Sequence, residues 1–423
     1  MSNPKFQDLA VSEPLLRALE EEGYTHPTPI QQEGIPLVLA GRDLLATAQT
    51  GTGKTAAFAL PILQMLSEKI PHTKKPIRSL ILTPTRELAI QIDDSLKAYG
   101  RHLRLKTAVV LGGVSAEPQI KALRRQPDIV VATPGRLLDL HNRGFIPLDR
   151  VEVLVLDEAD RMLDMGFIKD VRRIVNLLPK KRQTLFFSAT LGPVVARLAS
   201  DMLRDPATVV IAPPATVAGN IAQKVMFVQQ MHKRELLAEV LRGVDVSRAL
   251  VFTRTKHRAN RVSKQLTQDG IRADAIHSNK SQGARQRALS DFDRGRIKVL
   301  VGTDVVARGI DVDGISHVIN YEMPEDPESY VHRIGRTARA GADGVALSFC
   351  AAEEVMRLRD IEKLTHESLV PVEDHRYHCT ATAALNGRTA ARAEAQANAA
   401  PSNRPKFGRN AHKRRQGDRR RFK

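Results

Sequence analysis

The sequence predicts an α/β protein with two doubly wound parallel-sheet domains. Short apolar runs rich in β-branched residues alternate with helical patterns along the whole chain, which is typical of β–α–β units. One of these runs, at 151–156, ends at the carboxylates Asp157 and Glu158, and open α/β sheets bind ligands at such strand ends. With 423 residues, the chain is also longer than one hydrophobic core usually supports, so two domains are expected.

The strand-like runs form two series with a turn-rich stretch between them. The first series occupies residues 44–46, 79–83, 107–111, 128–133, 151–156, 183–188 and 208–211. The second occupies residues 224–228, 249–253, 273–276, 299–301, 317–320 and 345–349. Because prolines, alanines and glycine dominate the stretch between them, we expect a first domain at 1–211, a linker at 212–220 and a second domain at 221–366.

The chain is strongly basic, above all near its end. Its formal net charge is +18, and residues 386–423 contribute +10 of it, from twelve Lys and Arg against Glu394 and Asp418. Apolar periodicity is missing there, so residues 367–423 are expected to form a basic, disordered tail. The charge indicates a polyanionic partner, with nucleic acid favoured over an anionic membrane surface.

Other features of the sequence argue against secretion and membrane insertion. The first ten residues contain no apolar signal-like segment, and no run approaches the roughly 18 apolar residues of a membrane span. The two cysteines, Cys350 and Cys379, are too few for a disulfide framework and lack the spacing of a metal site. We therefore expect a cytoplasmic protein.

The segment AQTGTGKT at 48–55 predicts a phosphate-binding loop. It follows the apolar run 44–46 and opens a helical pattern at 56–66. Gly51 and Gly53 allow backbone N–H groups to close around phosphate oxygens, while Lys54 would neutralise phosphate charge and Thr55 would hold Mg²⁺. Ala48 stands where the general pattern has glycine, and a plain glycine-rich turn is the alternative interpretation.

The carboxylates at 157 and 158 complement this loop. Asp157 would bind Mg²⁺, directly or through water, and Glu158 would orient or deprotonate the attacking water. Solvated charges at a strand end are the alternative, but the apolar β-branched run directly before them disfavours it. Loop and carboxylates together predict a nucleotide hydrolase.

The letters DEAD stand at 157–160, and from Phe6 to about Phe349 the chain resembles the DEAD-box RNA helicases. Other family motifs follow in the family's order: Phe6 with GYTHPTPIQ at 23–31, PTRELA at 84–89, GG at 112–113, TPGR at 133–136, SAT at 188–190, VFTR at 251–254, QGAR at 282–285, TDVVARGID at 303–311 and HRIGRTARAG at 332–341. The resemblance implies two RecA-like domains, ATP and Mg²⁺ as cofactors, and RNA bound through its phosphates and sugars.

The resemblance also implies residue roles. Nucleotide binding falls to Phe6, Tyr24, Gln31, Gln49, Thr50, Gly51, Thr52, Gly53, Lys54, Thr55 and Asp311, with Gln31 reading the adenine edge and Phe6 stacking on the base. Catalysis falls to Lys54, Asp157 and Glu158, with Arg336 and Arg339 as arginine fingers. RNA binding falls to Pro84, Thr85, Arg86, Gly113, Thr133, Gly135, Arg136, Arg254, Gln282, Arg285 and Thr303, and bridging of the domains stays open for the last four. Coupling of hydrolysis to RNA falls to Asp160, Ser188, Thr190 and His332.

The second half shows two local features of its own. Arg333, Arg336 and Arg339 repeat every three residues, which predicts that they lie near one helical face. Ala338 stands where many family members have glycine, so the loop after Arg336 is expected to be stiffer. The segment 277–295 and the tail are most similar to the bacterial RhlE-type subgroup.

The predicted function is that of an ATP-dependent RNA helicase that unwinds short duplexes locally and remodels RNA–protein complexes, with ribosomal or RNA-decay complexes as candidate partners. An ATP-dependent RNA clamp or ribosome-assembly remodeller with little unwinding is one alternative. A DNA translocase is another, because phosphate contacts alone do not exclude DNA. A non-catalytic RNA-binding scaffold is disfavoured by the complete set of Lys54, Asp157, Glu158, Arg336 and Arg339.

Overall fold

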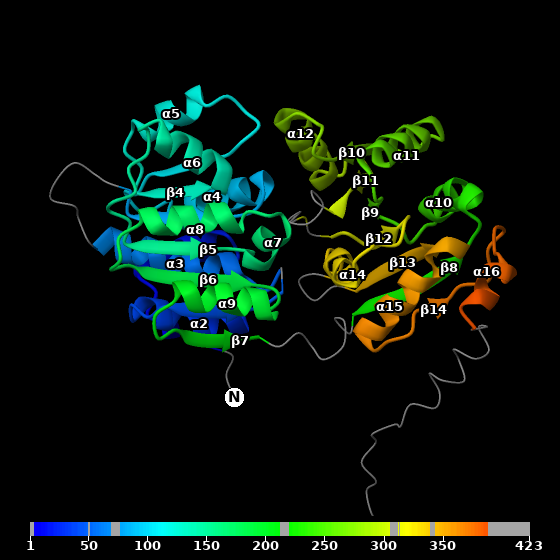
Figure 1. Cartoon of the computed structure of the whole chain (residues 1–423), viewed down its shortest axis with the longest axis horizontal. Helices are drawn as coiled ribbons and strands as arrows, with labels where there is room; N and C mark the ends of the chain where they lie inside the picture. The colour runs from blue at the N-terminus through cyan, green and yellow to red at the C-terminus, as the bar shows by residue number, and fades with distance from the viewer. Residues whose placement is uncertain are drawn as a thin grey trace, which may run out of the picture.

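The computed structural model describes residues 4–49, 51–68, 77–211, 220–304, 312, 314–338 and 343–387. These residues form two parallel sheets of seven strands each, with helices on both faces of each sheet (Figure 1). The predicted fold class, two doubly wound α/β domains, is confirmed.

The first sheet has the strand order β3-β4-β2-β5-β6-β1-β7. Its strands are β1 Leu44–Thr47, β2 Ser79–Leu82, β3 Thr107–Val110, β4 Ile129–Ala132, β5 Val153–Leu156, β6 Gln183–Ser188 and β7 Ala207–Val210. The central strands β2, β4 and β5 are buried at every position, as expected for apolar runs covered by helices on both faces. All of these strands were expected at nearly these positions.

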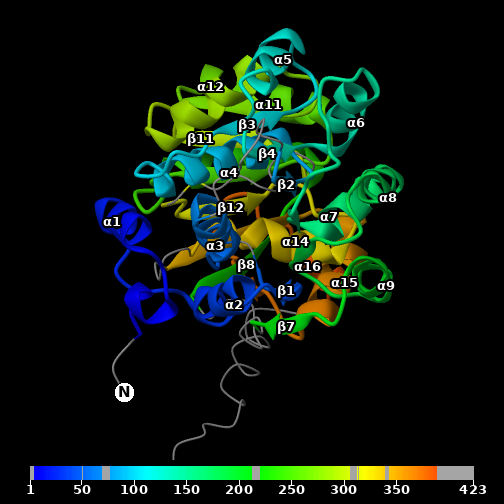
Figure 2. The same ribbon diagram turned by 90° about the vertical axis from the view of Figure 1, so that its left-hand side faces the viewer.

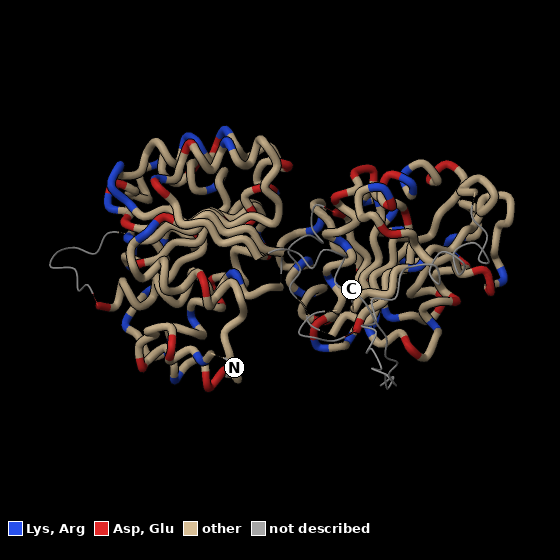
Figure 3. The backbone as a smooth tube through the Cα atoms, turned by 90° about the horizontal axis from the view of Figure 1, so that it is seen from below, with Lys and Arg blue, Asp and Glu red and all other residues tan. Residues whose placement is uncertain are grey.

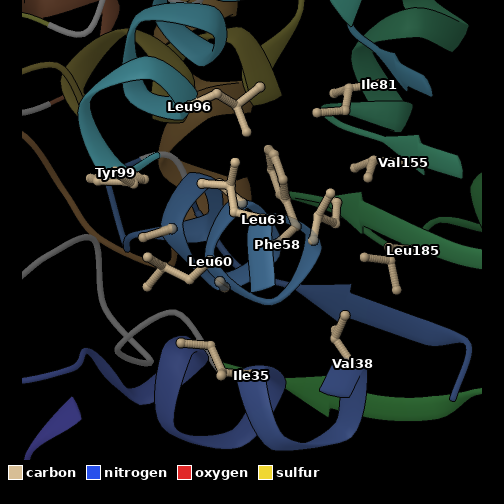
Figure 4. Packing of buried hydrophobic residues seen from close by; sticks show 14 of the residues in the cluster. Ile35, Val38, Phe58, Leu60, Leu63, Ile81, Leu96, Tyr99, Val155 and Leu185 are labelled. Atoms are coloured by element: carbon tan, nitrogen blue, oxygen red, sulfur yellow. The ribbon is translucent and has the colours of Figure 1, made fainter. Parts of the chain in front are cut away.

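Two layers of helices cover the first sheet, and Figure 2 shows α2 and α3 on one side with α8 and α9 on the other. The helices are α1 Glu13–Glu21, α2 Pro29–Leu39, α3 Lys54–Glu68, α4 Arg86–Tyr99, α5 Glu117–Leu123, α6 Pro134–Asn142, α7 Ala159–Asp164, α8 Ile168–Leu177 and α9 Pro193–Met202, preceded by the 3₁₀ helix η1 Phe6–Leu9. In Figure 4, Phe58 and Leu63 of α3 lie between the sheet and Leu96 of α4. This packing fixes the start of α3, and with it the predicted phosphate loop, against the sheet.

The second sheet has the order β10-β11-β9-β12-β13-β8-β14. Its strands are β8 Ile221–Phe227, β9 Ala249–Phe252, β10 Ala273–Ile276, β11 Val299–Gly302, β12 His317–Asn320, β13 Gly344–Cys350 and β14 Val370–Pro371. Its helices are α10 Lys233–Arg242, α11 Lys256–Gln268, α12 Gln282–Asp293, α14 Pro327–Ile334, α15 Val355–Thr365 and α16 Thr380–Leu385, with 3₁₀ turns η2 Gln230–His232 and η3 Ala352–Glu354. Counted from the first strand of each domain, the two sheets have the same order.

The boundary predicted between the second domain and the tail is wrong. Residues 370–371 form β14, which pairs in parallel with β8, and His378 makes an antiparallel bridge to Val228. The Cys379 N–H donates to the Phe227 carbonyl at 2.9 Å, which attaches α16 to the same strand. Residues 367–387 therefore belong to the second domain, and residues 388–423 lie outside the described residues.

Charge and membrane features complete the description. Figure 3 shows Lys and Arg mixed with Asp and Glu over both domains. Within the part of the chain that the structure describes, no helix combines the length and apolar character needed to cross a membrane. Cys350 is buried and Cys379 half-buried, and both are free thiols.

Candidate active site and nucleic-acid interface

Most predicted site residues of the first domain follow strands β1 to β6, and parallel strands bring these ends to one edge of the sheet. The loop after β1 has the backbone that a phosphate cradle needs. Gly51 and Gly53 have φ of +84° and +91°, a region that other residues enter only with strain. A Cβ on Gly53 would also collide with the Gln31 amide. Both glycines are therefore required by the conformation of this loop.

Two other side chains shape the loop. Gln31 donates from Nε2 to the Gly53 carbonyl at 3.0 Å and accepts from the Thr28 N–H at 2.9 Å. Lys54, only 6% exposed, donates from Nζ to the Ala48 carbonyl at 2.7 Å. Its ammonium thus lies over the loop, where it would meet a phosphate. Thr55 follows in the first turn of α3.

The carboxylates after β5 occupy different electrostatic environments. Burial raises the pKa of Asp157 to about 7. The charge of Lys54 lowers this pKa, and the charges of Glu158 and Asp160 raise it and so offset part of the effect of Lys54. Burial alone would also raise the pKa of Glu158, but the charges of Arg161, Lys54 and Arg336 together hold it below its usual value. Glu158 is therefore held in its ionised form, whereas Asp157 favours a cation beside it.

Glu158 has an unusual backbone. Its φ of +52° lies in the left-handed region, where it forms the N-cap of the short helix α7. A non-glycine residue held in this region costs of order 1–3 kcal/mol and is most often found at functional sites. The side chain it carries is paired with Arg161, with Nη1 and Oε2 2.8 Å apart.

Asp160 connects the carboxylate segment to the SAT segment after β6. Its Oδ2 accepts hydrogen bonds from the N–H groups of Ala189 at 3.1 Å and Thr190 at 2.9 Å, and from the Thr190 hydroxyl at 3.0 Å. The Ser188 hydroxyl donates to the Thr190 carbonyl at 2.6 Å. The structure thus brings together three of the four predicted coupling residues.

The fourth, His332, comes from the second domain. It lines a cavity of about 250 Å³ between the domains, together with Gln49 and Thr190 of the first. The same cavity is bordered by Val331 and Gly335, at the end of α14. His332 therefore lies across the domain boundary from the SAT segment.

Arg333 and Arg336 do not lie on one helix, contrary to the expectation from their spacing. Helix α14 ends at Ile334, with Gly335 as its C-cap, so the three-residue repeat does not continue along a helix. Arg333 is fully buried and makes a two-pronged ion pair with Asp304 at 2.5 and 2.7 Å. Arg336 donates from Nε to the His332 carbonyl at 3.2 Å and acts on Glu158 across the cleft.

The departure from the family pattern at Ala338 falls at a backbone position that favours glycine. Ala338 has a φ of +56°, a left-handed conformation that glycine adopts without strain. A Cβ on Gly344 would collide with Thr337 and with the Ala338 N–H, so these segments pack closely. Arg339 lies outside the described residues, as do Thr50 and Asp311.

Most predicted RNA-binding residues of the first domain line one cavity of about 430 Å³ between the domains. Its lining is Pro84, Thr85, Arg86, Gly112, Thr133, Gly135, Arg136, Asp139, Met165 and Phe167 from the first domain, with Ser278 and Arg285 from the second. Gly113 has a φ of +71°, and a Cβ there would collide with the Arg86 guanidinium. The cavity thus combines backbone, hydroxyl and guanidinium groups, which suit a sugar–phosphate backbone.

Gln282 and Arg285 contact the first domain directly. Gln282 donates from Nε2 to Glu87 Oε1 at 3.0 Å, and Arg285 Nη2 lies 2.5 Å from Glu87 Oε2. All three side chains are buried. Glu87 was quoted within its motif but not predicted as a site residue, because nothing in the sequence indicates a partner almost two hundred residues away.

Two other predicted RNA-binding residues are placed differently. Arg254 is half-buried and donates from Nη2 to Glu322 Oε1 at 3.3 Å, so its guanidinium has a carboxylate partner within its own domain. Thr303 is buried at the end of β11. Neither residue lines the cavity that holds Arg86 and Arg136.

The structure places the two aromatic residues predicted for the base side differently. Tyr24 is 47% exposed and packs edge-on against Tyr99, the last residue of α4, with ring centroids 6.0 Å apart. Phe6 is buried in the core cluster, so only a small part of its ring could meet a base.

The donor set fits Mg²⁺ bound together with nucleotide phosphates. Among the described residues, no group of three or more His, Cys, Asp or Glu side chains could hold a metal ion by itself. Mg²⁺ usually takes one or two carboxylates and completes its coordination with water and substrate phosphates. Asp157, with its raised pKa, and Thr55 match that smaller requirement.

A glycine-rich phosphate loop, a buried carboxylate pair and an arginine from a second domain define a nucleotide hydrolase of the P-loop class. The family model for the DEAD/DEAH box helicases matches residues 28–199, and the helicase conserved C-terminal domain matches residues 232–341. The chain therefore belongs to the DEAD-box helicase family.

Individual relatives agree. The chain is 42% identical over 386 residues to the ATP-dependent RNA helicase CshA of Limosilactobacillus reuteri, which covers 91% of this chain and 76% of that protein. It is 43% identical over 364 residues to the DEAD-box ATP-dependent RNA helicase CshA of Bacillus anthracis, which covers 86% of this chain and 68% of that protein.

Solved structures have the same fold. S. cerevisiae Dbp5 bound to RNA and ADP BeF3 is 30% identical with a TM-score of 0.78, covering 90% of this chain and 99% of that chain. A DEAD box protein from the hyperthermophile Methanococcus jannaschii is 40% identical with a TM-score of 0.52, covering 87% of this chain and 99% of that chain.

Proposed function

We propose that this chain is an ATP-dependent RNA helicase that couples ATP hydrolysis to closure of its two domains on RNA. One observation carries the proposal: Arg336 of the second domain lies near enough to Glu158 of the first to help lower its pKa. Closure thus brings together a proton acceptor and a cation that neither domain supplies alone. The names of the CshA relatives support the same activity.

For hydrolysis, each residue of the first domain has a separate task. Lys54 would leave the Ala48 carbonyl to bind the β and γ phosphates, and the loop N–H groups around Gly51 and Gly53 would hold their oxygens. Thr55 and Asp157 would hold Mg²⁺, which neutralises phosphate charge during the reaction. Glu158, held ionised by its lowered pKa, would accept a hydrogen bond from the attacking water, orient it and take its proton as the reaction proceeds.

The second domain would complete the site. Arg336 would stabilise charge on the γ phosphate, while Asp160 and the SAT segment would transmit the state of the nucleotide to the domain boundary near His332. Arg339 and Asp311 remain proposed partners of the nucleotide on the strength of their motifs. The pairing of Glu87 with Gln282 and Arg285 supports a bridging role for these two residues in the closed form.

RNA would bind in the cavity that Arg86, Thr133 and Arg136 line. Because its groups suit phosphates and sugars, binding would be largely independent of sequence. Closure around one strand would separate a short duplex locally, without processive movement. Ribosomal or RNA-decay complexes and a cytoplasmic location remain proposals. The relatives carry the CshA name and give no support to the RhlE-type subgroup.

The test is ATP hydrolysis by the full chain with single-stranded RNA, with DNA of the same sequence, and without nucleic acid. RNA should stimulate turnover strongly and DNA little, and a short RNA duplex should separate only when ATP is present. Equal stimulation by DNA would favour a DNA translocase. Stimulation without strand separation would favour an RNA clamp or remodeller.

A further inference from the structure

Arg161 is a buried charge beside the carboxylate that we assign to water activation. Its side chain and that of Glu158 are 6% and 7% exposed, and Nη1 lies 2.8 Å from Oε2. Removing one partner of a buried ion pair leaves the other charged and desolvated, which is far more costly than losing a surface pair. Such a pair therefore fixes the orientation of both side chains.

The backbone gives this pair its geometry. Glu158 caps α7 in a left-handed conformation, and Arg161 lies one helical turn further along the same helix. The Glu158 side chain is thus folded back over α7 and held there through Oε2. Among the residues that the structure describes, no donor to the second oxygen, Oε1, is recorded.

The geometry points to Arg161 as a positioning residue that anchors Glu158 through Oε2 and leaves Oε1 to orient water. This role presupposes the proposed RNA-stimulated ATPase. It adds to that function a residue outside the predicted site, which acts through Glu158 and touches neither ATP nor water.

The first test is Arg161→Met in the full chain, with kcat and KM for ATP measured at saturating RNA. We expect kcat to fall by about 10²-fold, the cost of a misplaced catalytic group, with little change in KM. Arg161→Lys should recover part of the loss, because an ammonium can still donate one hydrogen bond to Oε2. Arg173→Met, an exposed arginine on α8 paired with Asp170, is the matched control and should leave kcat unchanged.

A double-mutant cycle separates positioning from general support of the fold. In a Glu158→Gln background, adding Arg161→Met should cause no further loss of kcat, because the residue acts only through Glu158. The double variant also contains no unpaired buried charge, so it should fold even if Arg161→Met does not, and thermal unfolding of all variants checks this.

Two results would overturn the role of Arg161: losses that multiply in the double variant, or a rise in KM with an unchanged kcat. Failure of the proposed function would be seen elsewhere, as a wild-type chain that RNA does not stimulate.

Discussion

The two domains have the same strand order, but the lysine that stands at the matching place in each domain has different partners. In each, the strand in the sixth place of the sheet, β1 or β8, leads into a helix that starts with a lysine: Lys54 on α3 and Lys233 on α10. Lys54 contacts one backbone carbonyl. Lys233 is fully buried and donates from Nζ to the carbonyls of Tyr321 at 2.8 Å and Phe349 at 3.2 Å, and to Glu354 Oε2 at 2.5 Å.

In the second domain, the Glu354 carboxylate is therefore the anion that pairs with the lysine, as a phosphate would pair with Lys54 in the first domain. It is fully buried and also accepts hydrogen bonds from the N–H groups of Met323 at 3.2 Å and Ala351 at 3.0 Å. The anion is supplied by the protein, so this site is closed to a nucleotide. The comparison shows that the shared fold places a lysine at the start of this helix in both domains. The neighbouring residues determine whether the anionic partner of that lysine is a side chain of the protein or a bound phosphate.

The strand ends differ in the same way. Asp157 and Glu158 follow β5, whereas Tyr321 and Glu322 follow β12 at the matching place in the second sheet. Glu322 is paired with Arg254 at 3.3 Å and lies 3.6 Å from Arg258. The second domain neutralises this carboxylate internally, and its Arg336 is the arginine that we propose for the other domain's site.

The largest expected effect comes from the residue that crosses between the domains. Arg336→Ala should lower kcat by about 10³–10⁵-fold, the usual contribution of an arginine finger, and should weaken ATP binding much less. Steady-state hydrolysis and nucleotide titration measure the two quantities. Arg296→Ala, which removes an exposed arginine paired with Asp291 in the same domain, is the control. A loss confined to ATP affinity would remove Arg336 from the chemistry.

The two lysines should give opposite results when replaced. Lys54→Met should abolish most hydrolysis and cost less stability than Lys233→Met, because among the described residues Lys54 donates one hydrogen bond, to a backbone carbonyl, and its charge only assists Asp157 and Glu158 from nearby. Lys233→Met should instead destabilise the second domain by about 3–5 kcal/mol, since Glu354 is left buried and unpaired. Urea unfolding and ATPase assays on both variants make the comparison.

A compensating variant sharpens that result. Lys233→Met combined with Glu354→Gln removes both charges and should recover much of the lost stability. If Lys233→Met lowered ATP affinity at unchanged stability, Lys233 would belong to a working nucleotide site and the contrast between the domains would be wrong.

The first-domain carboxylate also predicts a pH dependence. The pKa of Asp157 is raised by burial to about 7, so without nucleotide this group is largely protonated below that pH. Because the folded pKa of Asp157 is higher than its unfolded value of 3.8, the folded state binds this proton more tightly than the unfolded chain does. The contribution of Asp157 to the stability of the nucleotide-free protein therefore falls as pH rises from about 4 to about 7. Mg²⁺ needs the ionised form, so affinity for Mg·ATP should rise about tenfold between pH 6 and pH 8, with proton release on binding.

Calorimetric titration in two buffers with different ionisation enthalpies measures that proton release. Asp157→Asn should bind more weakly and flatten the profile, which separates Asp157 from the titration of ATP itself. An equally steep profile in the variant would assign the pH dependence to another group.

The sequence predicted most strands because apolar β-branched runs in a parallel sheet are buried on both faces. It failed where that signal is missing. Strand β14 has only two residues, one of them proline, and α16 has six, so neither shows a hydrophobic period. Both are held by contacts with β8 instead, and that long-range pairing determines where the second domain ends.

The candidate site shows the same difference between residues that a local sequence pattern reveals and residues that depend on contacts distant in sequence. Gly51 and Gly53 could be proposed from the sequence because a local pattern predicts the backbone that they adopt. Glu87 and Lys233 were missed because their partners are distant in sequence.

The smallest expected effect concerns the basic segment that follows the second domain. Residues 388–423 carry a net charge of +10, whereas Gly387 immediately follows α16, which packs against β8. A chain that ends at Gly387 keeps every described element of both domains. It should bind RNA several-fold more weakly and show a flatter dependence of affinity on salt, since each neutralised phosphate contributes about −0.7 to the log–log slope on single strands. Saturating RNA should restore most of the turnover, because Lys54, Glu158 and Arg336 are unchanged.

A full-length chain with the twelve Lys and Arg of this segment replaced by Gln separates charge from length, and should behave like the truncated chain. An unchanged salt slope would show that the segment does not hold RNA. A collapse of kcat at saturating RNA would show that the two domains alone do not form the complete enzyme.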